Sequence, residues 1–195
     1  MTMTVMTAVL WVAVLGNLLL VLRLAGRLRF LLDPLRNPPP IPAPAVGEPA
    51  PPFSANTLDG RPLTLAQYAD RSLTLLYLSY NCPSCRTFLP TLGDLQRSAR
   101  NRGGELVLVV FDEDSTARAA TDRLIEQYGL NGPVVLITSG HPLQRAYNPR
   151  MASPFFIHVE RGITRSTGGV GLADWLTLVR GWQSPAASAT SGARR

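Results

Sequence analysis

The chain is apolar in short continuous runs that are separated by more polar segments. SLTLLYLSY at 72–80 and ELVLVVF at 105–111 are apolar almost throughout, and PVVLI at 133–137 repeats the pattern. Runs of this length without a polar face are typical of strands that are buried on both sides of a sheet. The pattern therefore predicts three central strands.

Apolar positions with helical spacing follow these runs. The helical segments are 83–100, 115–128, 142–147 and 172–182. Ser115 is the predicted N-cap of the second segment. Pro90 is predicted to kink the first, because a proline within a helix removes a backbone hydrogen bond.

Two further segments have the pattern of β-hairpins. The first covers 53–65 with a turn at Asp59-Gly60, and the second covers 154–168 with a turn at Arg161-Gly162. Strands that alternate with helices, followed by a hairpin and a last helix, predict an α/β fold with a mixed sheet and helices on both faces. The predicted domain extends over 53–183.

The first 22 residues contain no charged side chain. About 20 helical residues cross the hydrocarbon core of a bilayer, so this run is long enough to span it. A cleaved signal peptide would begin with a basic region and end at a small-residue cleavage site, whereas this run is neutral and continues into RLAGRLRF. We therefore predict an uncleaved transmembrane anchor with a juxtamembrane helix over 1–32, in which 5–22 contact the lipid bilayer.

Proline and small polar residues dominate the two segments that flank the domain. Residues 34–52 hold nine of the 17 prolines, which favours an extended polyproline conformation, and we predict a linker over 33–52. The end of the chain, 184–195, has the composition of a disordered tail.

The formal net charge of +6 is concentrated near the ends of the chain. Residues 37–193 contain 13 arginines and 12 acidic residues, a balance of +1. A nucleic-acid-binding protein would carry a basic stripe on its folded body. The charge distribution therefore excludes nucleic acid as a partner.

The two cysteines, Cys82 and Cys85, lie in the sequence CPSC between a predicted strand and a predicted helix. A structural disulfide would close a loop of only four residues and would stabilise the fold by roughly 2 kcal/mol. Structural zinc needs four ligands, and the two histidines, His141 and His158, do not form a metal-binding pair. We therefore predict no structural metal site.

A reversible dithiol explains more of the local sequence. Cys82 would lie where a strand ends and a helix begins, and free backbone N–H groups at such a position stabilise a thiolate. Pro83 suits the first helical turn, because its missing N–H has no partner there. Cys85 follows one turn later and could attack a mixed disulfide on Cys82. The predicted chemistry is thiol–disulfide exchange, which requires no cofactor.

Several of these features resemble a known family. CPSC after an apolar strand, the helix proline Pro90 and the late segment SPFFIHVE are similar to thioredoxin-like proteins. The anchor, GEPAPPFSANTLDGRPLTL and YNPRMASPFFIHVERGITRSTGG resemble membrane-anchored TlpA/ResA-like redoxins of the AhpC/TSA type, most closely the MauD-type methylamine-utilisation accessory proteins. The resemblance covers residues 1–183 and implies a thioredoxin-like fold.

The resemblance also implies roles for individual residues. Cys82 would be the nucleophile, Cys85 the resolving cysteine, and Pro154 a cis-proline beside them. The residues expected to contact a client are Ser153, Pro83 and Ser84. The partners would be client proteins with thiols or disulfides, and a second redox protein that recycles the dithiol. The direction of exchange stays open.

Two positions depart from the family pattern. A glutamate often lies six residues after the first cysteine of such redoxins, and thioredoxins carry a buried aspartate six residues before it. Here these positions are Phe88 and Leu76. The side chains that would relay a proton are therefore replaced by apolar ones.

Two other functions compete with this prediction. A peroxiredoxin-like peroxidase would have threonine and proline three and seven residues before Cys82, where this chain has Ser79 and Leu75. A copper carrier of the Sco type would combine both cysteines with a distant histidine such as His158, but that group uses three residues between its cysteines.

The orientation of the anchor is predicted differently by two arguments. Basic residues follow the apolar run and none precedes it, which by the positive-inside rule would place the domain in the cytoplasm. The resemblance implies an extracytoplasmic domain, where thiol–disulfide chemistry finds its clients. We expect a single-pass protein with an extracytoplasmic domain.

Overall fold

The computed structural model describes residues 5–7, 10–11, 13–23, 43–112, 114 and 116–184. The chain divides into two units, Met1–Pro40 and Ile41–Arg195. In the first unit the described residues are helical and their side chains are exposed. No helix within the described residues is both long and apolar enough to cross a membrane. The first half of the predicted linker, 33–42, and the predicted tail from 185 onward lie outside the described residues.

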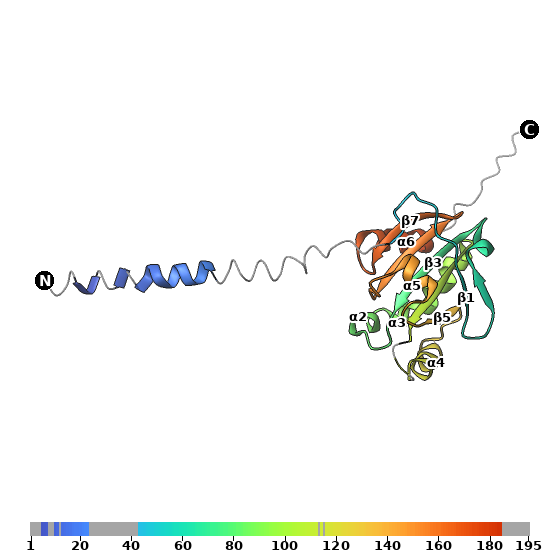
Figure 1. The fold of residues 1–195 in the computed structure, drawn as a ribbon, viewed down its shortest axis with the longest axis horizontal. Coiled ribbons are helices and arrows are strands. Elements are labelled where there is room, and N and C mark those ends of the chain that lie inside the picture. Colours follow the sequence, from blue (N-terminus) through green and yellow to red (C-terminus); the bar gives the residue numbers. More distant parts are fainter. Residues whose placement is uncertain are drawn as a thin grey trace, which may run out of the picture. The chain divides into compact units, whose positions relative to one another are not determined.

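A five-stranded mixed sheet forms the centre of the second unit, with the strand order β5-β4-β3-β6-β7 (Figure 1). Its strands are β3 (Ser72–Leu78), β4 (Gly104–Phe111), β5 (Val134–Ile137), β6 (Phe155–Glu160) and β7 (Ile163–Gly169). β3, β4 and β5 run parallel, whereas β6 and β7 continue the sheet in antiparallel pairs. The predicted mixed sheet and the hairpin β6–β7 are confirmed.

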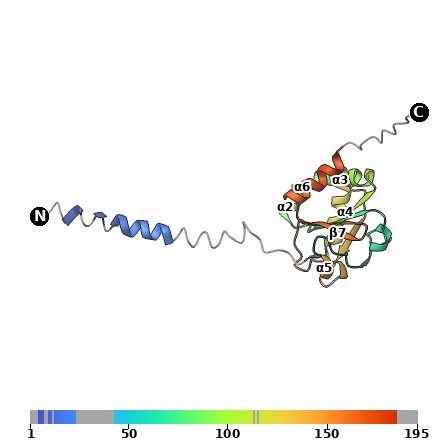
Figure 2. The same cartoon turned by 90° about the horizontal axis from the view of Figure 1, so that it is seen from above.

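Helices cover both faces of this sheet (Figure 2). One face carries α3 (Leu89–Asn101), α6 (Ala173–Gln183) and, beside α3, α4 (Ala117–Tyr128). The other face carries α5 (Pro142–Tyr147), the short helix η1 (Leu65–Tyr68), and the predicted hairpin of β1 (Ser54–Asn56) and β2 (Pro62–Thr64). The expected arrangement of helices on both faces is therefore confirmed.

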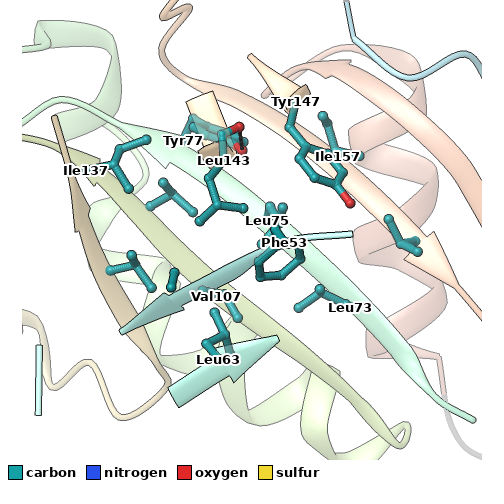
Figure 3. Close-up of a cluster of buried hydrophobic side chains, with 14 of the residues drawn as sticks. Phe53, Leu63, Leu73, Leu75, Tyr77, Val107, Ile137, Leu143, Tyr147 and Ile157 are labelled. Carbon is teal, nitrogen blue, oxygen red and sulfur yellow. Dashed lines mark hydrogen bonds between the residues drawn. The ribbon is translucent and has the colours of Figure 1, made fainter. Parts of the chain in front are cut away.

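The central strand β3 contributes to a separate apolar core on each face of the sheet. Leu73, Leu75 and Tyr77 point into the cluster that Figure 3 shows, and Leu76 and Leu78 belong to the cluster beneath α3 and α6. Because alternate side chains of a strand point to opposite faces, a continuous apolar run is needed to fill both cores. Burial of each leucine stabilises the fold by roughly 1.5–3 kcal/mol.

Residues 47–50, here called the entry segment, lie along the outer edge of the sheet. Gly47 donates to the Thr164 carbonyl at 2.8 Å, Thr164 donates to the Glu48 carbonyl at 3.0 Å, and Ala50 donates to the Gly162 carbonyl at 2.8 Å. Pro49 forms a bridge with Ile163. The contacts of the domain thus extend into the last part of the predicted linker, 33–52.

The helix predicted over 83–100 is broken just before Pro90 rather than kinked at it. The helical pattern is divided into α2 (Pro83–Arg86) and α3, and Phe88, at a φ of −112°, is the N-cap of the second helix. Pro90 falls in the first turn of α3, where backbone N–H groups have no helical partner and a proline removes no hydrogen bond. The N-cap of α4 is Thr116, and the predicted N-cap Ser115 lies outside the described residues.

Candidate active site

Cys82 connects the end of β3 to the start of α2. Its N–H donates to the Ser79 carbonyl at 3.1 Å, which closes the turn after the strand. It is the N-cap residue of α2, and its Sγ accepts a hydrogen bond from the Cys85 N–H at 3.2 Å. Pro83 occupies the first helical position, as predicted. The half-buried Cys82 sulfur is therefore held in place by a backbone N–H donor.

Cys85 lies one turn further along α2 and is 2% exposed. It belongs to the buried cluster that includes Leu76 and Leu89, and both cysteines are free thiols. Burial, together with its hydrogen bond to Cys82, raises the pKa of the Cys85 thiol to about 12. One sulfur of the pair is thus accessible, and the other stays protonated and shielded.

The Ser153–Pro154 peptide bond is cis, as predicted. It immediately precedes β6, whose first residue, Phe155, pairs with Tyr77 near the end of β3. This pairing brings the loop to the cysteines, and the Cys82 thiol donates to the Ser153 carbonyl at 3.7 Å. The predicted proximity of Ser153 and Cys82 is confirmed.

The remaining sequence-predicted positions surround this arrangement. Pro83 and Ser84 are exposed on α2, where an approaching chain can reach them. Leu76 is fully buried, and Phe88 is half-buried against the same cluster as Cys85. The two positions that hold acids in related redoxins therefore carry apolar side chains that pack in the same cluster as Cys85.

Two buried amides, which the sequence reasoning missed, hold the loop before Ser153. Asn148 is 0% exposed, donates to the Ala152 carbonyl at 2.8 Å and accepts from the Ala152 N–H at 2.9 Å. Gln144 donates to the Pro149 carbonyl at 2.9 Å. The segment YNPRMASP contains Asn148, but an asparagine before a proline in a loop gives no sign of burial.

We expect Asn148→Ala to lower the free energy of unfolding by about 1–3 kcal/mol, because both backbone groups of Ala152 lose a buried partner. Denaturant titration measures the change, with the exposed Asn101→Ala at the end of α3 as the matched control. Equal effects of the two substitutions would contradict a positioning role for Asn148.

The two histidines lie apart from the cysteines. His141 is the N-cap residue of α5 and accepts from the Leu143 N–H at 3.2 Å. His158 hydrogen-bonds Thr74 at 2.9 Å and lies three residues beyond Phe155, about 10 Å along the strand. Among the described residues, no group of three or more histidine, cysteine or acidic side chains could hold a metal ion.

The sequence profile of the AhpC/TSA family matches residues 46–166. This match covers more than half of the chain, so the protein belongs to the AhpC/TSA family. Family membership and the fold bear out the predicted class, a thiol-based oxidoreductase. No curated protein sequence matches the chain significantly.

Solved structures support the thioredoxin-like fold. A thiol:disulfide interchange protein of the thioredoxin family from Chlorobium tepidum is 24% identical, with a TM-score of 0.57 over 73% of this chain and 100% of its own. A secreted Mycobacterium tuberculosis disulfide oxidoreductase homologous to Escherichia coli DsbE is 22% identical, with a TM-score of 0.53 over 65% and 92%. The thioredoxin domain of a Bacteroides vulgatus thiol-disulfide oxidoreductase is 19% identical, with a TM-score of 0.57 over 72% and 99%.

Proposed function

We propose that this protein is a membrane-anchored thiol–disulfide oxidoreductase that exchanges disulfides with client proteins outside the cytoplasm. The observation that carries the proposal is the asymmetry of the CxxC pair. The Cys82 sulfur is accessible and accepts a backbone hydrogen bond at 3.2 Å, whereas the Cys85 sulfur is buried one turn behind it. An attacking and a resolving thiol need this difference.

The proposed reduction of a client has two steps. The Cys82 thiolate attacks one sulfur of the client disulfide, which forms a mixed disulfide and releases the other client sulfur as a thiolate that takes up a proton. Cys85 then loses its proton to solvent and attacks the Cys82 sulfur. The Cys82–Cys85 disulfide forms, the client thiolate leaves, and two electrons have passed to the client. The reverse sequence oxidises a client.

Ser153 supplies the proposed contact with the client backbone. An extended client segment can pair with backbone groups there as an added strand, which would hold the client disulfide over Cys82. Pro83 and Ser84 lie exposed in the first turn of α2, directly after Cys82, and complete the proposed contact. A second redox protein would return the Cys82–Cys85 pair to its starting state.

The proposal assigns residues 1–32 to a single-pass anchor and juxtamembrane helix, 33–52 to a linker, 53–183 to the catalytic domain and 184–195 to a tail. Support for the anchor comes from the uncharged first 22 residues. The finer resemblance to MauD-type proteins implies clients whose disulfides are made or rearranged after export. Support for export includes the likeness in fold to the secreted Mycobacterium tuberculosis protein.

The function is tested by comparing three activities of the reduced protein. We expect rapid reduction of a model protein disulfide, slow consumption of hydrogen peroxide, and no retention of Cu(I) against a competing chelator. Peroxide turnover as fast as disulfide exchange would favour a peroxiredoxin-like function instead. Stoichiometric copper that is lost in His158→Ala would favour a carrier of the Sco type.

We expect Cys82 to react with a membrane-impermeant thiol reagent in intact cells after mild reduction. This follows from an extracytoplasmic domain, and Cys82→Ser is the control for the labelled position. Labelling only after lysis would place the domain in the cytoplasm, as the arginines after the apolar run suggest.

A further inference from the structure

A groove of about 460 Å³ lies beside the CxxC motif. One wall is formed by the loop before Cys82, by α2 and by the start of α3, and the other wall is formed by one side of α4. Its lining residues on α4 and at the α4 N-cap are Thr116, Ala120, Arg123, Leu124, Gln127 and Tyr128. Across from them lie Tyr80, Asn81, Arg86 and Leu89. The groove thus combines apolar and aromatic walls with two guanidinium groups.

Within the described residues, no acidic side chain pairs with the two arginines of the groove. Neither Arg86 nor Arg123 forms an ion pair with any residue that the structure describes, and the only hydrogen bond found for Arg123 goes to the Ala119 carbonyl in its own helix. The acids of α4, Asp122 and Glu126, are absent from the groove lining, and neither forms an ion pair with Arg123.

Asp114 lies at the rim of the groove, because it contacts two of the lining residues. Its carboxylate accepts hydrogen bonds from the Tyr80 hydroxyl at 2.5 Å and from the Thr116 N–H at 2.7 Å. The hydrogen bonds from Thr116 and Tyr80 lower its pKa. Because this carboxylate already has its own partners, it leaves both arginines available to a ligand.

The topology places the groove and Ser153 on opposite sides of Cys82. β3, which leads into Cys82, lies between β4 and β6 in the sheet. The Ser153 loop enters β6, and the parallel strand β4 leads toward α4 at the same end of the sheet. A client segment that pairs with Ser153 and passes over Cys82 therefore continues toward the groove.

We infer that this groove binds an acidic side chain of the client, an aspartate or glutamate a few residues from the reacting cysteine. The inference rests on the proposed function and adds a preference among clients. Arg86 and Arg123 bind the carboxylate, and the aromatic and leucine side chains contact the neighbouring part of the client segment. Opposite charge favours productive encounter as well as binding, so the preference decreases at high ionic strength.

The test uses two short peptides that each carry one cysteine in a mixed disulfide with 2-mercaptoethanol. The peptides differ only in having glutamate or glutamine at positions a few residues before and after the cysteine. The reduced full-length protein, purified in detergent, is reacted with each peptide, and the ratio of the two second-order rate constants is measured at low and high ionic strength.

We expect the wild-type protein to favour the glutamate peptide at low ionic strength. Arg123→Gln, far from the cysteines in sequence, is expected to lower the ratio by about 2–5-fold, the effect of losing one exposed ion pair. Arg86→Gln should lower it similarly. Arg97→Gln, which removes one charge from the exposed face of α3 outside the groove, should leave the ratio unchanged.

Two failures can be told apart. Equal rates for both peptides, or a ratio that Arg123→Gln does not change, would overturn the inference alone. No reaction with either peptide would overturn the proposed function and the inference with it.

Discussion

Cys85→Ser is expected to accumulate mixed disulfides with client proteins, whereas Cys82→Ser should trap none. In Cys85→Ser the accessible Cys82 can still attack a client, but no second thiol can resolve the intermediate. In Cys82→Ser the remaining thiol is 2% exposed and its pKa is raised to about 12. Clients therefore cannot reach its sulfur, and it stays protonated and unreactive.

Non-reducing electrophoresis of cells that express each variant measures the trapping. Adducts should disappear on reduction and should be absent from the variant that lacks both cysteines. Equal trapping by the two single variants would reverse or abolish the assigned roles. Disulfide turnover should be lost in both, because each lacks one of the two exchange steps.

The reduced protein is expected to lose stability as the pH rises from about 9 toward 12, more steeply than Cys85→Ala. Burial raises the pKa of Cys85 from an ordinary 9.0 to about 12. Between these values the thiol ionises in the unfolded chain but not in the folded one, so the native state binds more protons. Stability therefore falls with pH, by up to about 1.4 kcal/mol per pH unit.

Urea titrations of the reduced protein at several alkaline pH values measure this difference. The pKa values of Tyr77 and Tyr147 are also raised by burial, and their ionisation destabilises the fold in the same direction. Both tyrosines are present in Cys85→Ala, so the difference between the two proteins isolates the thiol. Parallel pH profiles would show that Cys85 ionises in the folded protein as easily as in the unfolded chain.

The sheet could be predicted from the sequence because each central strand must fill two cores. Leu76 and Tyr77 are neighbours in the chain but belong to different clusters, and only a continuous apolar run permits that. The apolar spacing over 83–100 predicts a helix correctly, but it does not predict the division into α2 and α3. Apolar residues recur at the same interval in one kinked helix as in two successive helices. The break at Phe88 therefore leaves no sign in the apolar pattern.

The cysteines and the proline of the site could be predicted from short motifs, but the residues that hold them in place could not. The hydrogen bonds of Asn148 lie within its own loop, so nothing in the sequence distinguishes it from a solvated turn residue. The groove likewise depends on how α4 packs against α2 and α3. Arg123 reaches the neighbourhood of Arg86 only through that tertiary contact.

The entry segment has a mechanical consequence for a domain held by its N-terminal end. Tension applied from the N-terminal side loads the hydrogen bonds that join Gly47 and Glu48 to Thr164, at the outer edge of the sheet. β7 and β6 lie between that edge and β3, which leads into Cys82. A force that breaks the hydrogen bonds of the entry segment would release residues 47–50 from the sheet and extend the chain on the N-terminal side of the domain. The register of β3 and β6, beside the two cysteines, would be unchanged.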